Sequence, residues 1–182
     1  MPGRRWKKIS HGVLPVNNAV IDTGPLIHLH EIDQLEIITA VFSNLHIPEY
    51  VKREIRNEPI LKFIALHSDR IKVHPVSEPE LFPVKDAYSK FQLHLADLAV
   101  VTVLLKISDS LALTDDLALR RAIESNGRTV VGTVGILFKA YKRGVIDKPR
   151  LIELIDRIFN DSSLYLSSSF RMRVLSIAES LL

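Results

Sequence analysis

Cysteine is absent from all 182 residues of the chain, and this one absence excludes several kinds of chemistry. Disulfide bonds, thiolate catalysis, and zinc or iron–sulfur sites with cysteine ligands all require a thiol. Long apolar runs are absent too, because the longest, residues 98–105, is interrupted by Thr102 and is far too short to span a bilayer. No apolar signal-peptide segment follows the basic residues near the N-terminus. We therefore expect a cytoplasmic protein with no membrane contact.

The composition that remains is that of an ordinary globular domain. Apolar residues make up 47% of the chain and charged residues 25%, and 182 residues are enough for one sizeable core. The net charge of +3 is compatible with a polyanionic partner but does not identify one. Basic residues cluster ahead of any periodic segment, at Arg4, Arg5, Lys7 and Lys8. We expect a flexible basic segment over residues 1–18 and one domain over residues 19–182.

Short apolar runs alternate with longer amphipathic ones along the chain. The short runs are typical of strands in a parallel sheet covered on both faces, and they lie at residues 20–22, 45–47, 71–76, 111–114 and 129–131. Helical patterns separate them, at residues 26–42, 49–57, 60–68, 78–105 in at least two pieces, 117–126 and 134–143. Further helices are expected over residues 145–182. The alternation predicts an α/β domain with a helical C-terminal extension.

Acidic residues stand at the ends of two predicted strands. Asp22 comes directly after the first strand, and Asp115 and Asp116 follow Thr114 at the end of the fourth. Ligands of open α/β sheets bind beyond the carboxyl ends of the strands, so we expect these acids at one edge of the sheet. Each also has a simpler explanation, since Asp22 and either member of the later pair could cap the helix that follows.

Two further acids, Glu54 and Asp97, could join this edge. Glu54 lies about two turns into the helix after the second strand, from where a long carboxylate could reach back over the sheet. Asp97 borders the apolar face of its helix and needs an ion pair, hydrogen bonds or a cation. His28 and His30 face different directions on a predicted helix and form no competing metal site. Carboxylate oxygens without thiols suit Mg²⁺ or Mn²⁺.

The order of these acids resembles that of the PIN-domain nucleases, the superfamily that contains the VapC-type toxins. The resemblance rests on "VIDTGPLI", on a Pro-initiated helix with a glutamate in "IPEYVKREI", on "LADLAVV", and on a strand-end Thr-x-Asp in "LALTDD". The segment "GRTVVGTVGILFKAYKRGVI" and the C-terminal helices look like the toxin-like branch. The similarity covers residues 19–182 and implies a three-layer α/β/α PIN-like fold with a short-stranded parallel sheet.

The resemblance also implies roles for individual residues. The acidic, catalytic pocket would consist of Asp22, Glu54, Asp97 and Asp116. The metal ligands would be Asp22, Asp97 and Asp116, with Asp115 as the alternative for the fourth acid. Thr23 and Thr114 would support the pocket. One departure is Ala96-Asp97, where many relatives in this branch carry Gly-Glu, so the third acid here is shorter by one methylene.

The implied activity is hydrolysis of RNA phosphodiester bonds by water that a bound Mg²⁺ or Mn²⁺ activates. Candidate contacts to RNA phosphates are Lys52, Arg53, Arg120 and Arg121. A toxin-like protein would have an antitoxin partner and would form a homodimer, for which residues 60–66 and 174–182 are candidate surfaces.

Three other interpretations stay open. The first is an inactive PIN-fold module that binds RNA or a protein. The second is a phosphotransfer protein, which is disfavoured because Gly24 occupies the position of the second phosphatase aspartate and the paired acids come late in the chain. The third is a dinucleotide enzyme, which is disfavoured because Gly132 and Gly135 do not form G-x-G-x-x-G.

Overall fold

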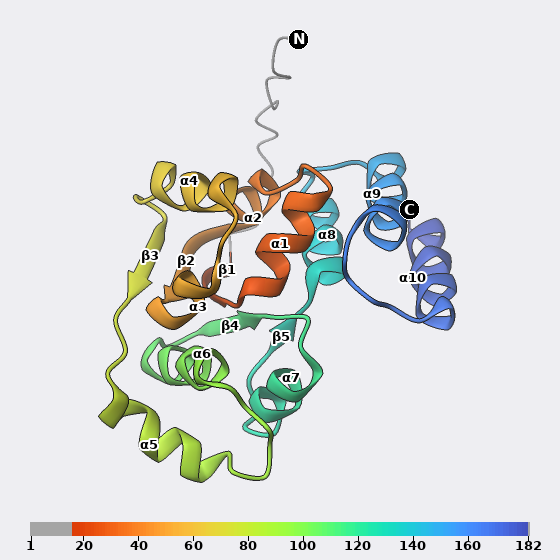
Figure 1. The fold of residues 1–182 in the computed structure, drawn as a ribbon. Coiled ribbons are helices and arrows are strands. Elements are labelled where there is room, and N and C mark those ends of the chain that lie inside the picture. Colours follow the sequence, from red (N-terminus) through yellow and green to blue (C-terminus); the bar gives the residue numbers. More distant parts are fainter. Residues whose placement is uncertain (1–15, 182) are drawn as a thin grey trace.

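A parallel sheet of five strands runs through the centre of the structure, in the order β3-β2-β1-β4-β5 (Figure 1). The computed structural model describes residues 16–181. The strands are β1 (Val16–Ile21), β2 (Phe42–Pro48), β3 (Ile71–His74), β4 (Ser110–Leu113) and β5 (Val130–Val131). Of the predicted basic segment, residues 1–15 lie outside the described part, and residues 16–18 begin β1.

Helices cover both faces of this sheet (Figure 1). One face carries α1 (Thr23–Glu31), α2 (Glu36–Val41) and α8 (Thr133–Lys142). The other carries α6 (Leu95–Lys106) and α7 (Leu117–Glu124), and α5 (Glu78–Ala87) packs on α6. Two further helices, α3 (Glu49–Glu54) and α4 (Glu58–Leu66), lie near β2 and β3. The C-terminal extension consists of α9 (Lys148–Asp161), which packs on α8, and α10 (Ser168–Ser180), which packs on α9. The predicted three-layer α/β fold is confirmed.

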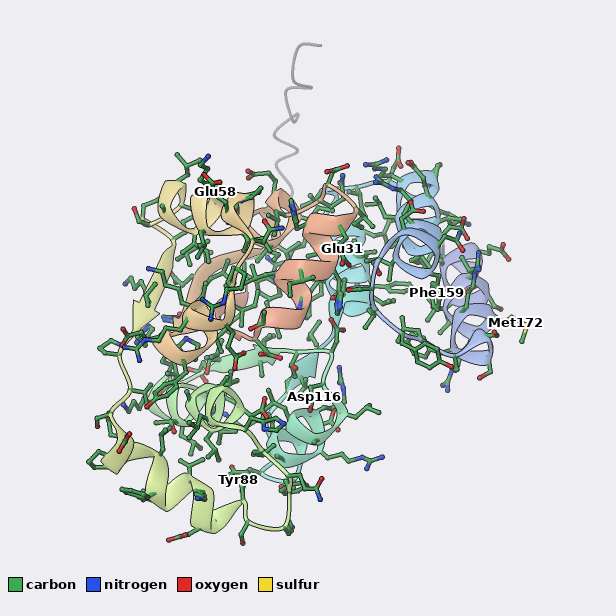
Figure 2. The ribbon with its side chains drawn as sticks, in the orientation of Figure 1. Glu31, Glu58, Tyr88, Asp116, Phe159 and Met172 are labelled. Carbon is green, nitrogen blue, oxygen red and sulfur yellow. The ribbon has the colours of Figure 1, made fainter. Side chains whose placement is uncertain are left out.

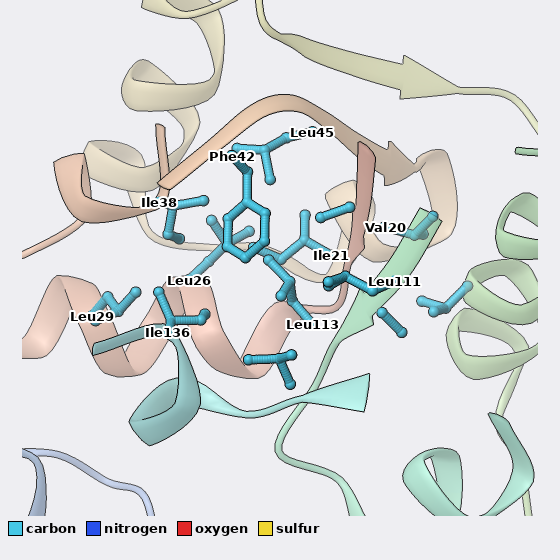
Figure 3. Packing of buried hydrophobic residues seen from close by; sticks show 14 of the residues in the cluster. Val20, Ile21, Leu26, Leu29, Ile38, Phe42, Leu45, Leu111, Leu113 and Ile136 are labelled. Carbon is cyan, nitrogen blue, oxygen red and sulfur yellow. The ribbon is translucent and has the colours of Figure 1, made fainter. Parts of the chain in front are cut away.

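Burial on both faces explains why the strand sequences are apolar throughout. Ile21, Leu26, Phe42 and Leu113 are fully buried between the sheet and α1, α2 and α8 (Figure 3). Each such side chain contributes roughly 1.5–3 kcal/mol when it leaves water. On the other face, α6 is apolar on nearly all sides and is buried accordingly. None of the described helices is both long and apolar enough to cross a bilayer.

The prediction of one helix over residues 26–42 is wrong. The helix α1 ends at Glu31, and Asp33 follows in the left-handed region with φ of 55°. The chain then forms the short helix α2 and enters β2 at Phe42, whose side chain is fully buried. Apolar residues continue at helical spacing through this turn because both helices and the strand bury them in the same core.

The strand register places the acid-bearing strand ends at one edge. Ile21 of β1 pairs with Leu113 of β4, and the Asp22 N–H donates to the Leu113 carbonyl oxygen at 2.9 Å. Val20 pairs with His46 of β2, so the start of α3 lies at the same edge. The residues that follow β1, β2 and β4 therefore converge where α/β sheets bind ligands.

Candidate acidic active site

Asp22 occupies the centre of the edge where β1 and β4 end. Its Oδ1 accepts from the Thr23 N–H at 2.7 Å, and its Oδ2 accepts from the Thr114 hydroxyl at 2.8 Å. Burial raises the pKa of Asp22 to about 6, and repulsion from Asp97 and Glu54 adds to this rise. The two hydrogen bonds lower the pKa but do not offset burial. Asp22 is therefore both the cap of α1 and an acid whose ionisation is disfavoured.

Thr114 connects Asp22 to Asp116. Its side chain is fully buried, and its hydroxyl oxygen accepts from the Asp116 N–H at 3.1 Å while donating to Asp22. Asp116 is exposed at the start of α7 (Figure 2), where its Oδ1 caps the helix by accepting from the Leu119 N–H at 2.7 Å. The predicted capping role and a place at the acidic edge are thus compatible in one residue.

Asp97 and Glu54 complete the acidic edge from two other helices. Asp97 lies in the first turn of α6, where its Oδ2 accepts from the His94 N–H at 2.8 Å. Burial raises the pKa of Asp97, and repulsion from Asp116 adds to the rise. Glu54 is the last residue of α3, and its Oε2 accepts from the Thr23 hydroxyl at 3.5 Å, the outer limit for a hydrogen bond. The four predicted acids therefore lie near one another, since Asp97 and Glu54 act on Asp22, and Asp116 acts on Asp97.

Asp115 points into a different environment from Asp116. Its Oδ1 accepts from the Thr133 N–H at 2.8 Å, and its Oδ2 accepts from the Thr133 hydroxyl at 2.5 Å and lies 2.9 Å from His28 Nδ1. Burial favours the neutral acid, but the hydrogen bonds from His28 and Thr133 outweigh it and lower the pKa of Asp115 below its ordinary value. Gly132 permits this packing, since a Cβ there would lie 2.7 Å from Asp115 Oδ1. Asp115 therefore links β4 to α1 and α8.

His28 is the residue of this edge that the sequence did not reveal. Its separation from Asp115 by 87 positions leaves no local pattern that joins them. Only one indication in the sequence connects His28 to this edge: it lies on α1, one turn after Gly24. Knowledge that α1 lies against α8 would have been needed to use it.

The predicted RNA-contacting residues fall on both sides of the acids. Lys52 and Arg53 line a hollow of about 530 Å³ beside Val73 of β3, where Arg53 pairs with Glu49 at 2.8 Å. On the other side, Arg120 donates to the carbonyl oxygens of Thr114 at 3.3 Å and Val130 at 3.4 Å, and lines a second hollow of about 680 Å³. Arg121 is exposed on α7.

The acids fit a hard cation by their chemistry. Within residues 16–181, no three histidine or acidic side chains already enclose a metal position. The donor set is nevertheless made of carboxylate oxygens, which Mg²⁺ and Mn²⁺ prefer, and their mutual repulsion is what a cation relieves. Asp97 and Asp116 each use one carboxylate oxygen in a helix cap, which leaves the other oxygen for a ligand.

A family model described as a PIN domain, DUF3368, matches residues 18–180, which is nearly the whole chain. No curated protein matches the chain.

Proposed function

The chain belongs to the PIN-domain family, a family of nucleases, and from this premise we propose that it is a metal-dependent endoribonuclease. The observation that carries the proposal is the coupling of acids from separate elements at one sheet edge. Asp22 follows β1, Asp97 lies in the first turn of α6 and Glu54 ends α3, yet the charges of Asp97 and Glu54 add to the burial that raises the pKa of Asp22 to about 6. Two acids, Asp22 and Asp97, whose ionisation is disfavoured in part by neighbouring carboxylates are the arrangement expected of a site built to hold a cation.

In this proposal Asp22, Asp97 and Asp116 hold Mg²⁺ or Mn²⁺. When bound, the ion supplies an activated water and stabilises negative charge on the scissile phosphate. Thr114 keeps Asp22 and Asp116 at a fixed separation, because its one hydroxyl bonds both residues. The exposed Glu54 accepts a proton from the attacking water as the P–O bond to the leaving nucleotide breaks. No covalent intermediate with the protein forms.

The roles of the basic residues follow from their positions. Lys52 and Arg53 on one side and Arg120 on the other bracket the acids along the strand order β3-β2-β1-β4-β5. A single RNA strand that crosses this edge meets cations before and after the acids, and these neutralise its phosphates. Arg121, exposed on α7, adds positive charge near this edge.

The experiment is cleavage of a structured RNA in the presence of Mn²⁺ by the wild type and by the Asp22→Asn and Asp116→Asn variants. We expect each variant to lose about a hundredfold or more of the activity. Asp86→Asn, an exposed change on α5, is the matched control and should cleave like the wild type. Equal cleavage by all four proteins, or none by the wild type, would reject the nuclease and favour the inactive binding module.

Two further proposals, a toxin role and a homodimer, rest on the resemblance to the toxin-like branch. We propose a toxin paired with an antitoxin, and a homodimer formed through helical surfaces at residues 60–66 and 174–182. The outward side chains of α10 are exposed, among them Met172 at 67% (Figure 2) and Ile177 at 46%, which supports a pairing surface there. The test is the mass in solution of Leu175 and Leu181 variants, together with co-purification from the native host. An unchanged mass and repeated absence of a partner would reject both assignments.

A further inference from the structure

A groove of about 680 Å³ begins at Asp115 and follows α8 to α10. Its lining is mainly apolar and includes the rings of Phe138 and Phe170, whereas Arg120, Lys139 and Lys142 supply positive charge. Asp115 lines one end of the groove and is followed in the chain by Asp116, so the groove lies beside the acidic edge. A chain that leaves the acidic edge toward β5 can therefore enter this groove.

The cations of the groove are crowded. Lys139 is half-buried, and burial together with the neighbouring charges of Arg143 and Lys142 lowers its pKa. Within residues 16–181, no carboxylate forms an ion pair with Lys139 or Lys142. The carboxylate of the groove, Asp115, is already occupied by Thr133 and His28. An anion lying in the groove would relieve this repulsion.

The wall formed by α10 is held in place by polar contacts. Lys148 Nζ donates to the carbonyl oxygens of Glu179 at 2.6 Å and Leu181 at 2.7 Å, and Arg171 forms an ion pair with Asp156 of α9. Phe170 is 41% exposed, so its ring is available to a ligand on this anchored helix. An exposed ring beside cations is the combination that binds single-stranded nucleic acid, because the ring stacks on a base and the cations hold the phosphates.

We propose that this groove holds the nucleotides next to the scissile phosphodiester bond, with Lys139 and Lys142 on the phosphates and Phe170 against a base. The inference rests on the proposed ribonuclease function, which it extends to residues that the acidic edge does not include. An RNA strand is favoured over an acidic amphipathic peptide because the groove lies beside the acids. Two of its cations, Lys139 and Lys142, also have no acidic partner within the described residues, whereas Arg120 pairs with Glu124 at 3.3 Å.

The test measures binding rather than cleavage. A fluorescein-labelled oligouridine of ten nucleotides is titrated with Asp22→Asn protein, which leaves the RNA intact, and anisotropy is followed at several salt concentrations. In this background Lys139→Gln/Lys142→Gln should weaken binding and reduce the slope of log K against log salt by about 1.4, since each single-strand phosphate contact contributes about 0.7. The matched control, Lys85→Gln/Lys90→Gln, changes two exposed lysines away from the groove and should leave affinity and slope unchanged.

Phe170 provides a second, independent variant. Phe170→Ala should weaken binding about fivefold or more with the slope unchanged, because stacking does not involve phosphate charge, and Phe170→Tyr should restore it. RNA binding that is equal in the groove variants and the control would overturn the proposal. If such variants instead lost affinity for an acidic amphipathic helical peptide, the groove would be assigned to a protein.

These outcomes are separable from those of the nuclease itself. RNA bound through the groove by a wild type that does not cleave would sustain this inference and reject the proposed function. Cleavage by the wild type, together with normal RNA binding by the groove variants, would sustain the proposed function and reject this inference.

Discussion

Replacing Asp22 with asparagine should stabilise the metal-free protein at neutral pH. In the folded protein, burial and the charges of Asp97 and Glu54 raise the pKa of Asp22 from 3.8 to about 6. Between pH 4 and 6 the folded protein therefore keeps a proton that the unfolded chain has lost. The free energy of unfolding consequently falls as the pH rises through this window. Asparagine carries no charge and avoids that loss.

The expected size follows from the same shift. A rise from 3.8 to about 6 corresponds to about 3 kcal/mol, at about 1.4 kcal/mol for each pKa unit. Asparagine can keep both contacts of Asp22, because its Oδ1 can accept from the Thr23 N–H and its amide can donate to the Thr114 hydroxyl oxygen. For a chain of this length, about 3 kcal/mol raises Tm by roughly 6–12 °C.

The assay is thermal unfolding followed by circular dichroism, in EDTA, near pH 4 and near pH 7.5. The wild type and Asp22→Asn should unfold together at the lower pH, and the variant should be the more stable protein at the higher pH. Asp86→Asn should match the wild type at both. Adding Mn²⁺ at neutral pH should stabilise the wild type and not the variant, because only binding to the folded state adds stability. A variant that is less stable at neutral pH, or a difference that does not change with pH, would refute the reasoning.

Two further variants test other parts of the structure. Asp115→Asn puts an amide against the donors of Thr133 and His28, and should lower the free energy of unfolding by about 2 kcal/mol in urea titrations while changing Mn²⁺ affinity little. Lost Mn²⁺ binding with unchanged stability would instead make Asp115 a ligand. Burial, with the charges of His74 and Lys72, lowers the pKa of His46 from 6.5 to about 4, so stability present above pH 6.5 is lost as the pH falls toward 4. His46→Gln should remove up to about 3 kcal/mol of this loss of unfolding free energy at acid pH, as measured by unfolding at several pH values. A variant that loses stability with falling pH as the wild type does would contradict the assignment.

The sequence predicts the architecture and the acidic edge for one physical reason. Parallel strands buried on both faces read as short apolar runs, and the first polar residue after such a run lies at the carboxyl edge of the sheet. Asp22 and Thr114 meet this condition, and the register of β1 with β4 brings them together.

What the sequence left undecided depends on contacts between distant segments. Asp115 and Asp116 follow the same strand, and the sequence does not distinguish them. Side chains of neighbouring residues in an extended chain point in opposite directions, so Asp115 faces Thr133 and Asp116 caps α7. The partner His28 comes from a helix far away in sequence. The groove along α8 needs α10 as its second wall, and no local pattern reveals that docking.

The central claim is that the coupled acids form a divalent-metal site. Calorimetric titration of Mn²⁺ into the wild type, Asp22→Asn and the Asp86→Asn control tests it most directly. We predict that the wild type and the control bind Mn²⁺ alike and that Asp22→Asn, with its fold intact by circular dichroism, does not. Equal binding by all three proteins, or no binding by the wild type, would contradict the account.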